Sequence, residues 1–304
     1  MQCSDTLAPI PYGNGTAVAL GYFDGVHLGH QNVLNAAQRA AARQQLSDAV
    51  FTFRLPPNSA AKGRAILTQT EKQRRMAARG VQHYFCPPFE SFCAFTPQAF
   101  VEEVLLRCLG AKHVFCGDNF TFGAHKSGNV DTLKTLCAAH GIGVHIVPMA
   151  EYDGALVSSS RIRACLEQGD LHAANAMLSD PYCLDMPVQH GKSFGRTLGF
   201  PTINQSYPPQ MLVPKSGVYI TETCVDGTWL PSATGLGTRP TVSGEGVTCE
   251  TFIVDYTGNL YGDTVRVRFH SYLKPTVKFD TVDALKAYID SAADAARTYF
   301  AQKP

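Results

Sequence analysis

The sequence predicts two consecutive domains of different class: an α/β domain built on a parallel sheet, then a small antiparallel β-barrel with a C-terminal helix. In the first half, short apolar runs alternate with helical patterns, which is typical of a parallel α/β sheet. After about residue 180, short β-rich runs separated by turn signals replace this alternation and favour a barrel. The length of 304 residues also suits two domains.

The elements of the first half follow from this alternation. Strands are expected where the apolar runs are short, over residues 17–20, 49–53, 84–86, 113–116 and 144–148. Helices are expected between them, over residues 32–44, 69–79, 97–109 and 130–140. A further helical segment over residues 160–178 ends before Pro181, since proline cannot continue a helix. We place the boundary there, with domains at residues 1–180 and 181–304.

The second half is expected to form the barrel. Its β-rich runs cover residues 217–224, 229–234, 249–256 and 264–269, with turn signals at 226–227 and 257–259. Residues 282–300 then show apolar side chains at helical spacing, among them Leu285, Ile289 and Ala296. We expect this helix to pack against the barrel.

Composition limits the classes of partner. Lys plus Arg number 26 and Asp plus Glu number 25, so the net charge of +1 gives no reason to expect nucleic acid or a membrane surface as a partner. No run approaches the roughly 18 apolar residues of a membrane span. The ten cysteines show no Cys-x-x-Cys pair, and the N-terminus lacks an apolar signal core. We therefore expect reduced thiols and a cytoplasmic location; the oligomeric state stays open.

The stretch over residues 21–30 carries the first chemical signal. Gly21, Gly25 and Gly29 follow an apolar run, an order that indicates a strand, a tight turn and a helix start. His27 and His30 fall on one face of that helix start, beside backbone N–H groups that lack intrahelical partners. Because the glycines leave no side chain in the way, the pattern predicts a triphosphate site. Two other interpretations stay open: a metal-binding pair, and histidines that only cap the helix.

A second phosphate signal lies over residues 157–163. Three hydroxyls and two cations open a helix there, and hydroxyls either cap exposed N–H groups or bind phosphate oxygens. Arginine supplies the planar cation that matches phosphate. By itself, serine before a helix is ordinary capping.

These segments occur in an order that resembles a known family. The stretch 21–30, Leu67-Thr68 with Glu71-Lys72, the stretch 117–123 with Gly128, and the stretch 158–163 resemble the HxGH nucleotidyltransferases, and more closely the bifunctional riboflavin kinase/FAD synthetases of bacteria. The resemblance implies a Rossmann-like FMN adenylyltransferase domain. It implies His27 and His30 as catalytic residues, Asn119 as a flavin contact, and a nucleotide site of Gly21, Phe23, Asp24, Gly29, Ser158, Ser159, Ser160 and Arg161. Phe120 and Phe122 are expected to be core residues.

The second half continues the same resemblance. Residues 191–204 are glycine-punctuated and basic and resemble the riboflavin kinase signature, which implies nucleotide contacts at Gly191, Gly195 and Arg196. Thr202 is expected to bind Mg²⁺ and Asn204 the flavin. In the stretch 249–256, Glu250 stands where the family has its catalytic glutamate. A carboxylate there would accept the proton of the ribityl hydroxyl of riboflavin.

Some positions depart from the family pattern. Arg54-Leu55-Pro56-Pro57 replaces an acidic residue and Pro-His-Pro, so a histidine near the adenylyl site is missing. Lys274 and Thr276 replace an arginine and a glutamate.

The expected activity is phosphorylation of riboflavin to FMN, followed by adenylylation of FMN to FAD, with ATP and Mg²⁺ at both steps. The alternatives are a riboflavin kinase with a degenerate first domain, and a flavin-binding protein without turnover.

Overall fold

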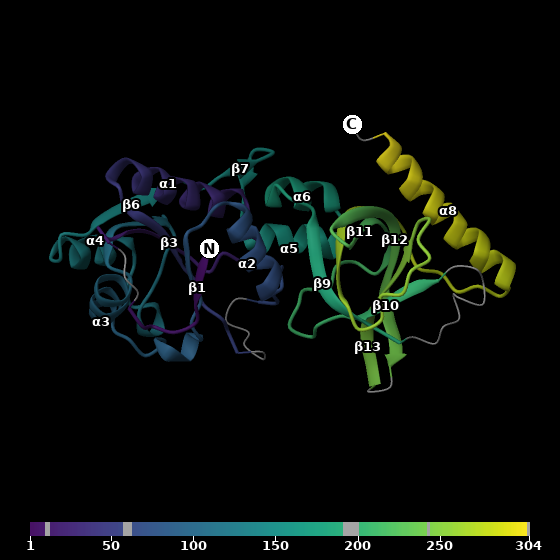
Figure 1. Ribbon diagram of the computed structural model, residues 1–304, viewed down its shortest axis with the longest axis horizontal. Helices are drawn as coiled ribbons and strands as arrows, with labels where there is room; N and C mark the ends of the chain where they lie inside the picture. Colours follow the sequence, from purple (N-terminus) through teal and green to yellow (C-terminus); the bar gives the residue numbers. More distant parts are fainter. Residues whose placement is uncertain (10–12, 57–62, 191–200, 242–243, 303–304) are drawn as a thin grey trace. The chain divides into compact units, whose positions relative to one another are not determined.

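The computed structural model describes residues 1–9, 13–56, 63–190, 201–241 and 244–302 (Figure 1). The chain forms two compact units. The first contains Met1–Gly63 and Lys72–Ser159, and the second contains Arg64–Glu71 and Ser160–Pro304. Within the described ranges, no helix has the length and apolar character that crossing a membrane requires.

The first unit is built on a six-stranded sheet in the order β1-β4-β3-β2-β5-β6, and every neighbouring pair is parallel. The predicted α/β class is thus confirmed. The strands are β1 (Gln2–Ser4), β2 (Thr16–Leu20), β3 (Ser47–Phe51), β4 (His83–Phe85), β5 (Ala111–Gly117) and β6 (Gly143–Val147). Between them lie α1 (Leu28–Gln44), α2 (Gln69–Ala78), α3 (Pro97–Ala99) with the π-helix η2 (Phe100–Cys108), and α4 (Val130–Ala138).

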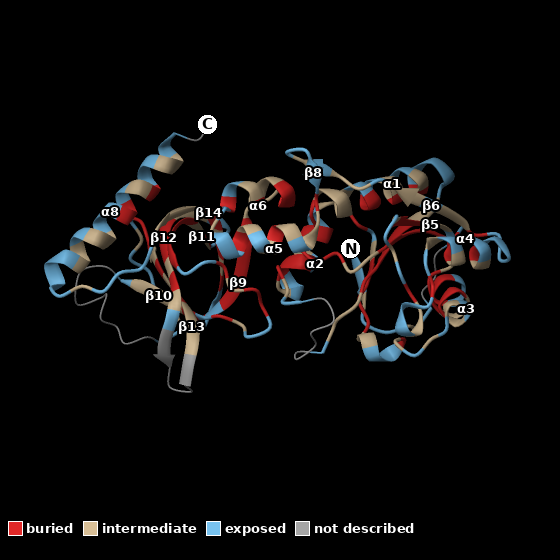
Figure 2. Ribbon diagram, turned by 180° about the vertical axis from the view of Figure 1, so that it is seen from behind, coloured by how far each residue is buried: buried red, intermediate tan, exposed pale blue. Residues whose placement is uncertain are grey.

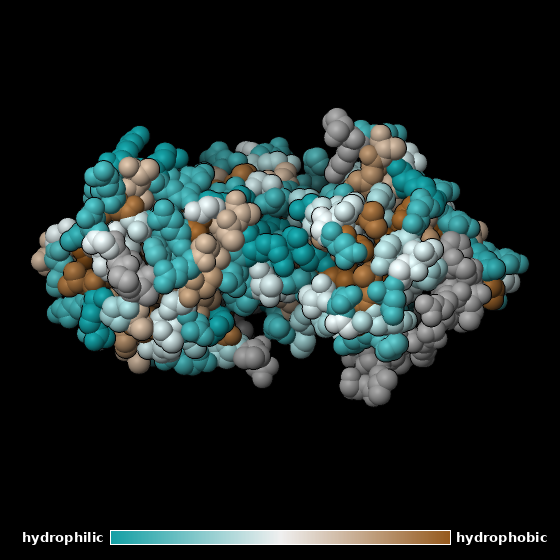
Figure 3. Space-filling view, in the orientation of Figure 1, coloured by the Kyte–Doolittle hydropathy of each residue, from teal (hydrophilic) through white to brown (hydrophobic). Residues whose placement is uncertain are grey.

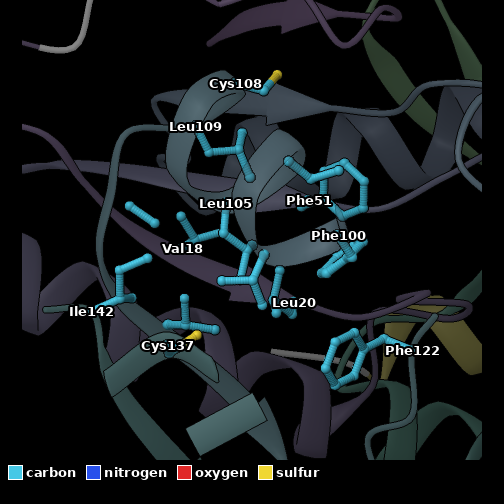
Figure 4. Close-up of a cluster of buried hydrophobic side chains, with 14 of the residues drawn as sticks. Val18, Leu20, Phe51, Phe100, Leu105, Cys108, Leu109, Phe122, Cys137 and Ile142 are labelled. Atoms are coloured by element: carbon cyan, nitrogen blue, oxygen red, sulfur yellow. The ribbon is translucent and has the colours of Figure 1, made fainter. Parts of the chain in front are cut away.

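Helices cover both faces of this sheet, which explains why all five residues of β2 are buried. Val18 and Leu20 point into a core that includes side chains of η2 and α4 (Figure 4). Helix α1 contacts β2, β3 and β5 and buries Val33 and Leu34. The sheet therefore holds the ends of its strands in fixed positions, and the predicted phosphate loop follows β2.

The second unit is a closed antiparallel barrel in the order β10-β13-β12-β11-β14-β9. Its strands are β9 (Tyr182–Gln189), β10 (Thr202–Ser206), β11 (Gly217–Val225), β12 (Thr228–Thr241), β13 (Gly244–Ile253) and β14 (Thr264–Lys274). Helix α8 (Val282–Ala301) buries Ala292, Ala293 and Ala296 against the barrel. Figure 2 colours buried residues red and shows the rest of α8 as intermediate or exposed. The predicted barrel with a packed C-terminal helix is confirmed.

The prediction of one helical segment over residues 160–178 is wrong, because two helices lie there. They are α5 (Ser159–Gln168) and α6 (Leu171–Leu178). Gly169 has a φ of 82°, a left-handed conformation that ends a helix. Asp170 then caps α6 by accepting a hydrogen bond from the Ala173 N–H at 3.0 Å.

Several element boundaries also differ from the prediction. Helix α1 begins at Leu28, four residues before the predicted start, because His27 already serves as its N-cap. Strand β3 ends at Phe51 and β13 at Ile253, both earlier than predicted. The predicted helix over residues 97–109 is one α-helical turn followed by the π-helix η2. Strands β1, β9 and β10, and the short pair β7 (Glu151–Tyr152) and β8 (Ala155–Leu156), were not predicted.

Candidate active sites

The loop after β2 is held in an unusual backbone conformation. Phe23, Gly25 and Val26 have φ values of 55°, 88° and 49°. A left-handed conformation is strained for a β-branched residue such as valine. Phe23 and Val26 are fully buried, and the Val26 N–H donates to the Phe23 carbonyl at 3.2 Å. Burial therefore fixes a strained loop where the phosphate site is predicted, and strain of this kind concentrates at functional sites.

His27 and His30 lie together at the start of α1. His27 Nδ1 accepts a hydrogen bond from the His30 N–H at 3.4 Å, so this ring nitrogen carries no proton. The two rings stack with centroids 3.6 Å apart, and His30 meets the Phe23 ring edge-on at 5.2 Å. His27 thus acts as the N-cap of α1, as the capping interpretation expects. Capping gives no role to His30, whose Nδ1 is buried and has no hydrogen-bond partner among the described residues.

The electrostatics of this site oppose a positive charge on His30. Burial lowers the pKa of His30 well below its usual value, and the charges of His27 and Lys72 lower it further. Neutral histidines stabilise phosphate oxygens as N–H donors rather than as cations. Lys72 places a positive charge near His30, which further opposes protonation of that ring.

Lys72 is a buried cation beside this loop, and the sequence predicted no role for it. It lies on α2 with only 3% of its surface exposed. Its Nζ donates to the Tyr22 carbonyl and to Thr52 Oγ1, both at 3.3 Å, and lies 4.9 Å from the Tyr22 ring centroid. Burial lowers the pKa of Lys72, and the nearby Cys86 and Asp24 oppose this effect. Its only signal in the sequence is its place in the Glu71-Lys72 motif.

Two other predicted segments are placed at the same end of the sheet. Ser159 Oγ donates to the Asp24 carbonyl at 3.0 Å, which joins the serine segment to the strained loop. Asn119 follows β5, the strand beside β2, and its side chain is exposed. The strand order reverses between β2 and β5, and open α/β sheets bind ligands at the carboxyl ends of strands at such a point.

The remaining predicted residues of this site are distributed as follows. Gly21 and Gly29 flank the strained loop, while Ser158 is half-buried beside Ser159. Ser160 and Arg161 continue into α5 and belong to the second compact unit. Phe122 is part of the hydrophobic core, labelled in Figure 4, and Phe120 packs against it. The prediction that these two rings are structural is supported.

In the barrel, strand register brings the predicted kinase residues together. Antiparallel pairing of β10 with β13 places Asn204 opposite Glu250 and Thr202 opposite Phe252. Thr251, between them on β13, is fully buried and its hydroxyl contacts that of Thr234 inside the barrel. Side chains alternate along a strand, so Thr202, Asn204, Glu250 and Phe252 share the outer face. Directly opposed side chains of this kind are close neighbours.

A pocket lies beside this patch. It has a volume of about 570 Å³, open solvent included, and Thr202, Asn204, Tyr256 and Tyr261 are among its lining residues. Figure 3 shows hydrophobic side chains on the second unit, around the place of β11 and β12 in Figure 1. Gly191, Gly195 and Arg196 lie outside the described residues.

Comparison with known proteins identifies the family. Family models match for FAD synthetase over residues 10–161 and for riboflavin kinase over residues 178–300. Proteins named bifunctional riboflavin kinase/FMN adenylyltransferase from Pseudomonas fluorescens, Listeria monocytogenes and Escherichia coli are 31%, 32% and 32% identical. Each alignment covers 94% of this chain, and 94%, 92% and 93% of the relative. The chain belongs to the bifunctional riboflavin kinase/FMN adenylyltransferase family. It is a transferase that carries both domains.

A solved structure extends the similarity to the whole fold. A Streptococcus pneumoniae protein described as a macrolide-efflux protein matches with a TM-score of 0.86 and 29% identity, over 97% of this chain and 98% of that one. The presence of both domains favours the bifunctional interpretation over a lone riboflavin kinase. It also favours catalysis over flavin binding without turnover.

Lys274, which departs from the pattern of the riboflavin kinase family, has a structural role. Its Nζ donates to the Tyr288 carbonyl at 3.0 Å and to Ser291 Oγ, and it lies 3.6 Å from the Tyr288 ring centroid. Lys274 therefore joins β14 to α8. Thr276, the other departure, is exposed after the end of β14.

Proposed function

We propose that the barrel domain, residues 181–304, transfers the γ-phosphoryl group of ATP to riboflavin and forms FMN and ADP. The α/β domain, residues 1–180, then joins FMN to the AMP part of a second ATP and releases pyrophosphate. The observation that carries the kinase assignment is the register that sets Asn204 opposite Glu250 beside Thr202. Family membership supports ATP, riboflavin and FMN as substrates.

In the kinase step, Glu250 accepts the proton of the terminal ribityl hydroxyl as its oxygen bonds to the γ-phosphorus of ATP. The bond between the γ-phosphorus and the bridging oxygen breaks, and ADP leaves. Asn204 offers an amide to the flavin, and the partly buried Phe252, opposite Thr202, offers apolar surface nearby. The oxygens of Thr202, Asn204 and Glu250 are the hard ligands that Mg²⁺ prefers. When bound, Mg²⁺ neutralises charge on the phosphates.

In the adenylyl step, a phosphate oxygen of FMN attacks the α-phosphorus of ATP, and the bond to the β-phosphate oxygen breaks. No covalent enzyme intermediate is needed, so positioning and charge stabilisation are the whole task. His27 and His30 would donate N–H groups to the departing pyrophosphate, beside the free N–H groups at the start of α1. Lys72 would supply the positive charge, and Asn119 a polar contact to the flavin.

The near balance of charges supports a protein that works on these small molecules without a nucleic-acid or membrane partner. The ten free cysteines support reduced thiols and a cytoplasmic location.

A time course tests the bifunctional assignment. Purified protein with riboflavin, ATP and Mg²⁺ should form FMN first and FAD later, as followed by chromatography of the flavins. An arrest at FMN would contradict adenylyl transfer by this chain.

Two variants test the separation of the sites. Glu250→Gln should slow FMN formation at least about 10²-fold and leave FAD formation from supplied FMN intact. His27→Ala with His30→Ala should accumulate FMN instead. Glu167→Gln and His172→Ala change the same residue types at exposed positions of α5 and α6, and both should behave like the unmodified chain. Loss of both activities in Glu250→Gln would contradict separate sites.

A further inference from the structure

A pair of histidines lies in the first unit, apart from the predicted adenylyl site. His113 is on β5 and His145 on the edge strand β6, and the register sets His113 opposite Gly143. His113 precedes Gly117, the last residue of β5, by four positions, which is about 13 Å along a strand. The adenylyl site is predicted at the other end, beyond Gly117, so the histidine pair is a separate feature.

The two rings are held with their nitrogens facing each other. His113 Nδ1 and His145 Nε2 are 3.1 Å apart. The Phe115 ring stacks on His145 with centroids 4.6 Å apart and planes 13° apart, which orients that ring. Gly143 makes the arrangement possible, because a Cβ there would lie 2.6 Å from His113 Nδ1.

The hydrogen bonds fix the protonation of His113. Its Nε2 lies 2.7 Å from Gln44 Oε1, at the end of α1. An amide oxygen only accepts, so His113 Nε2 carries a proton; in the neutral imidazole, Nδ1 then presents a lone pair toward His145. A histidine that binds metal typically donates its second ring N–H to such an oxygen, which fixes its tautomer.

We propose that His113 and His145 form a two-imidazole site for a borderline divalent metal ion such as Ni²⁺, Cu²⁺ or Zn²⁺. With metal–nitrogen bonds of about 2.05 Å, nitrogens 3.1 Å apart subtend about 98° at the metal, between square-planar and tetrahedral angles. The ion replaces the hydrogen-bonded proton between the rings, and the exposed His145 then carries its proton on Nδ1. Among the described residues no cluster of three or more His, Cys, Asp or Glu is placed to hold a metal, so water would complete the coordination.

The donor set predicts selectivity. Neutral nitrogen ligands suit borderline metals, whereas Mg²⁺ prefers oxygen ligands and keeps its waters. The Mg²⁺ used with ATP should therefore not compete for this site.

Titration of the full-length protein with Ni²⁺ tests the proposal. Calorimetry gives the affinity for Ni²⁺. In protein labelled with ¹⁵N-histidine, the ring signals of His113 and His145 should broaden at lower Ni²⁺ concentrations than those of the other histidines. His113→Gln and His145→Gln should each weaken this binding at least about 10-fold, as even loss of an outer-shell partner does. Gly143→Ala keeps both imidazoles but fills their space, and it should weaken binding similarly. Excess Mg²⁺ should leave the wild-type affinity unchanged.

His172→Gln is the control, because it removes an exposed histidine of the second unit, and its Ni²⁺ affinity should equal that of the wild type. Melting curves without metal show whether each variant folds. His145 is exposed on an edge strand, so His145→Gln serves even if His113→Gln is unstable. Unchanged Ni²⁺ affinity and broadening in a folded His145→Gln variant would overturn the proposal.

Discussion

A substitution at Gly29 can distinguish an effect on stability from an effect on substrate binding. A Cβ added there would lie 3.4 Å from the His27 ring and 3.8 Å from the Ala150 nitrogen, which are ordinary contacts. Gly29→Ala should therefore melt like the wild type. If phosphate approaches this backbone, the added methyl group should slow FAD formation about 10²-fold or more, because it displaces the groups that are stabilised in the transition state. Melting curves and FAD assays measure the two effects.

Gly21 provides the matched comparison. A Cβ at Gly21 would lie 3.1 Å from the Phe23 ring, so Gly21→Ala should lower the melting temperature as well as the activity. Normal FAD output from Gly29→Ala would show that no substrate contacts this backbone.

The buried His30 should make the stability of the first unit depend on pH. The unfolded chain protonates this histidine near its usual pKa of about 6.5, while the folded site resists protonation. The unfolded state thus binds more protons below about pH 6.5, so the free energy of unfolding falls as the pH drops through this range. Urea unfolding at about pH 7.5 and about pH 5.5 should show a smaller loss for His30→Gln than for the wild type. Equal losses would contradict a depressed pKa.

Lys72 is expected to act on His30 as well as on the loop. Its charge lowers the pKa of His30, so Lys72→Met should raise that pKa, as measured by NMR titration of the ring. The same change leaves the Tyr22 carbonyl and Thr52 without their cationic donor and should reduce FAD formation. Lys72→Arg keeps the charge and should shift the pKa less. An unchanged His30 pKa in Lys72→Met would contradict this coupling.

At the scale of elements, the break between α5 and α6 depends on Asp170. Asp170→Ala should destabilise the second unit by about 1 kcal/mol, because the cap of α6 is lost, whereas Asp170→Ser keeps a capping oxygen. Trp229, the only tryptophan of the chain, lies on β12 and reports unfolding of this unit by fluorescence. Equal urea midpoints for the alanine and serine variants would argue against a capping role.

Helices and strands were predicted well where the apolar residues follow a single clear spacing. Strand β2 was predicted because its apolar run is short and flanked by glycine, and α8 because its apolar residues recur on one face. The break at Gly169 was missed because a lone glycine inside a helical pattern is often tolerated. Strand β9 was missed although Tyr182, Leu184 and Met186 alternate with other residues as in a strand, and Pro187 lies within it.

The candidate sites were predictable to the extent that their residues are neighbours in sequence. His27 and His30 could be paired because three positions along a helix bring side chains together. Asn204 and Glu250 are 46 residues apart, and only the register of β10 with β13 sets them opposite each other. Lys72 was missed because a lysine near the start of a helix usually faces solvent.

At the scale of the whole molecule, the compact units and the proposed domains divide the chain differently. The riboflavin kinase model begins at residue 178, whereas the second compact unit begins at Ser160 and also contains Arg64–Glu71. Contacts inside this unit explain the difference. Glu71 lies 3.4 Å from Arg266 of β14 in an ion pair, and the Leu212 N–H donates to the Ala65 carbonyl at 2.8 Å.

Helices α5 and α6 should accordingly matter for the barrel although they precede the proposed kinase domain. Asn175 of α6 donates to the Phe269 carbonyl at 2.9 Å and accepts from the Tyr182 N–H at 2.7 Å, and the Lys215 N–H donates to the Leu166 carbonyl at 3.0 Å. A fragment of residues 160–304 should therefore melt at least about 5 °C higher than one of residues 181–304, since several kcal/mol of burial and hydrogen bonding are lost. In the full chain, Asn175→Ala should likewise lower the urea midpoint of the second unit, as reported by Trp229 fluorescence. Equal melting temperatures of the two fragments would mean that the barrel is complete from residue 181.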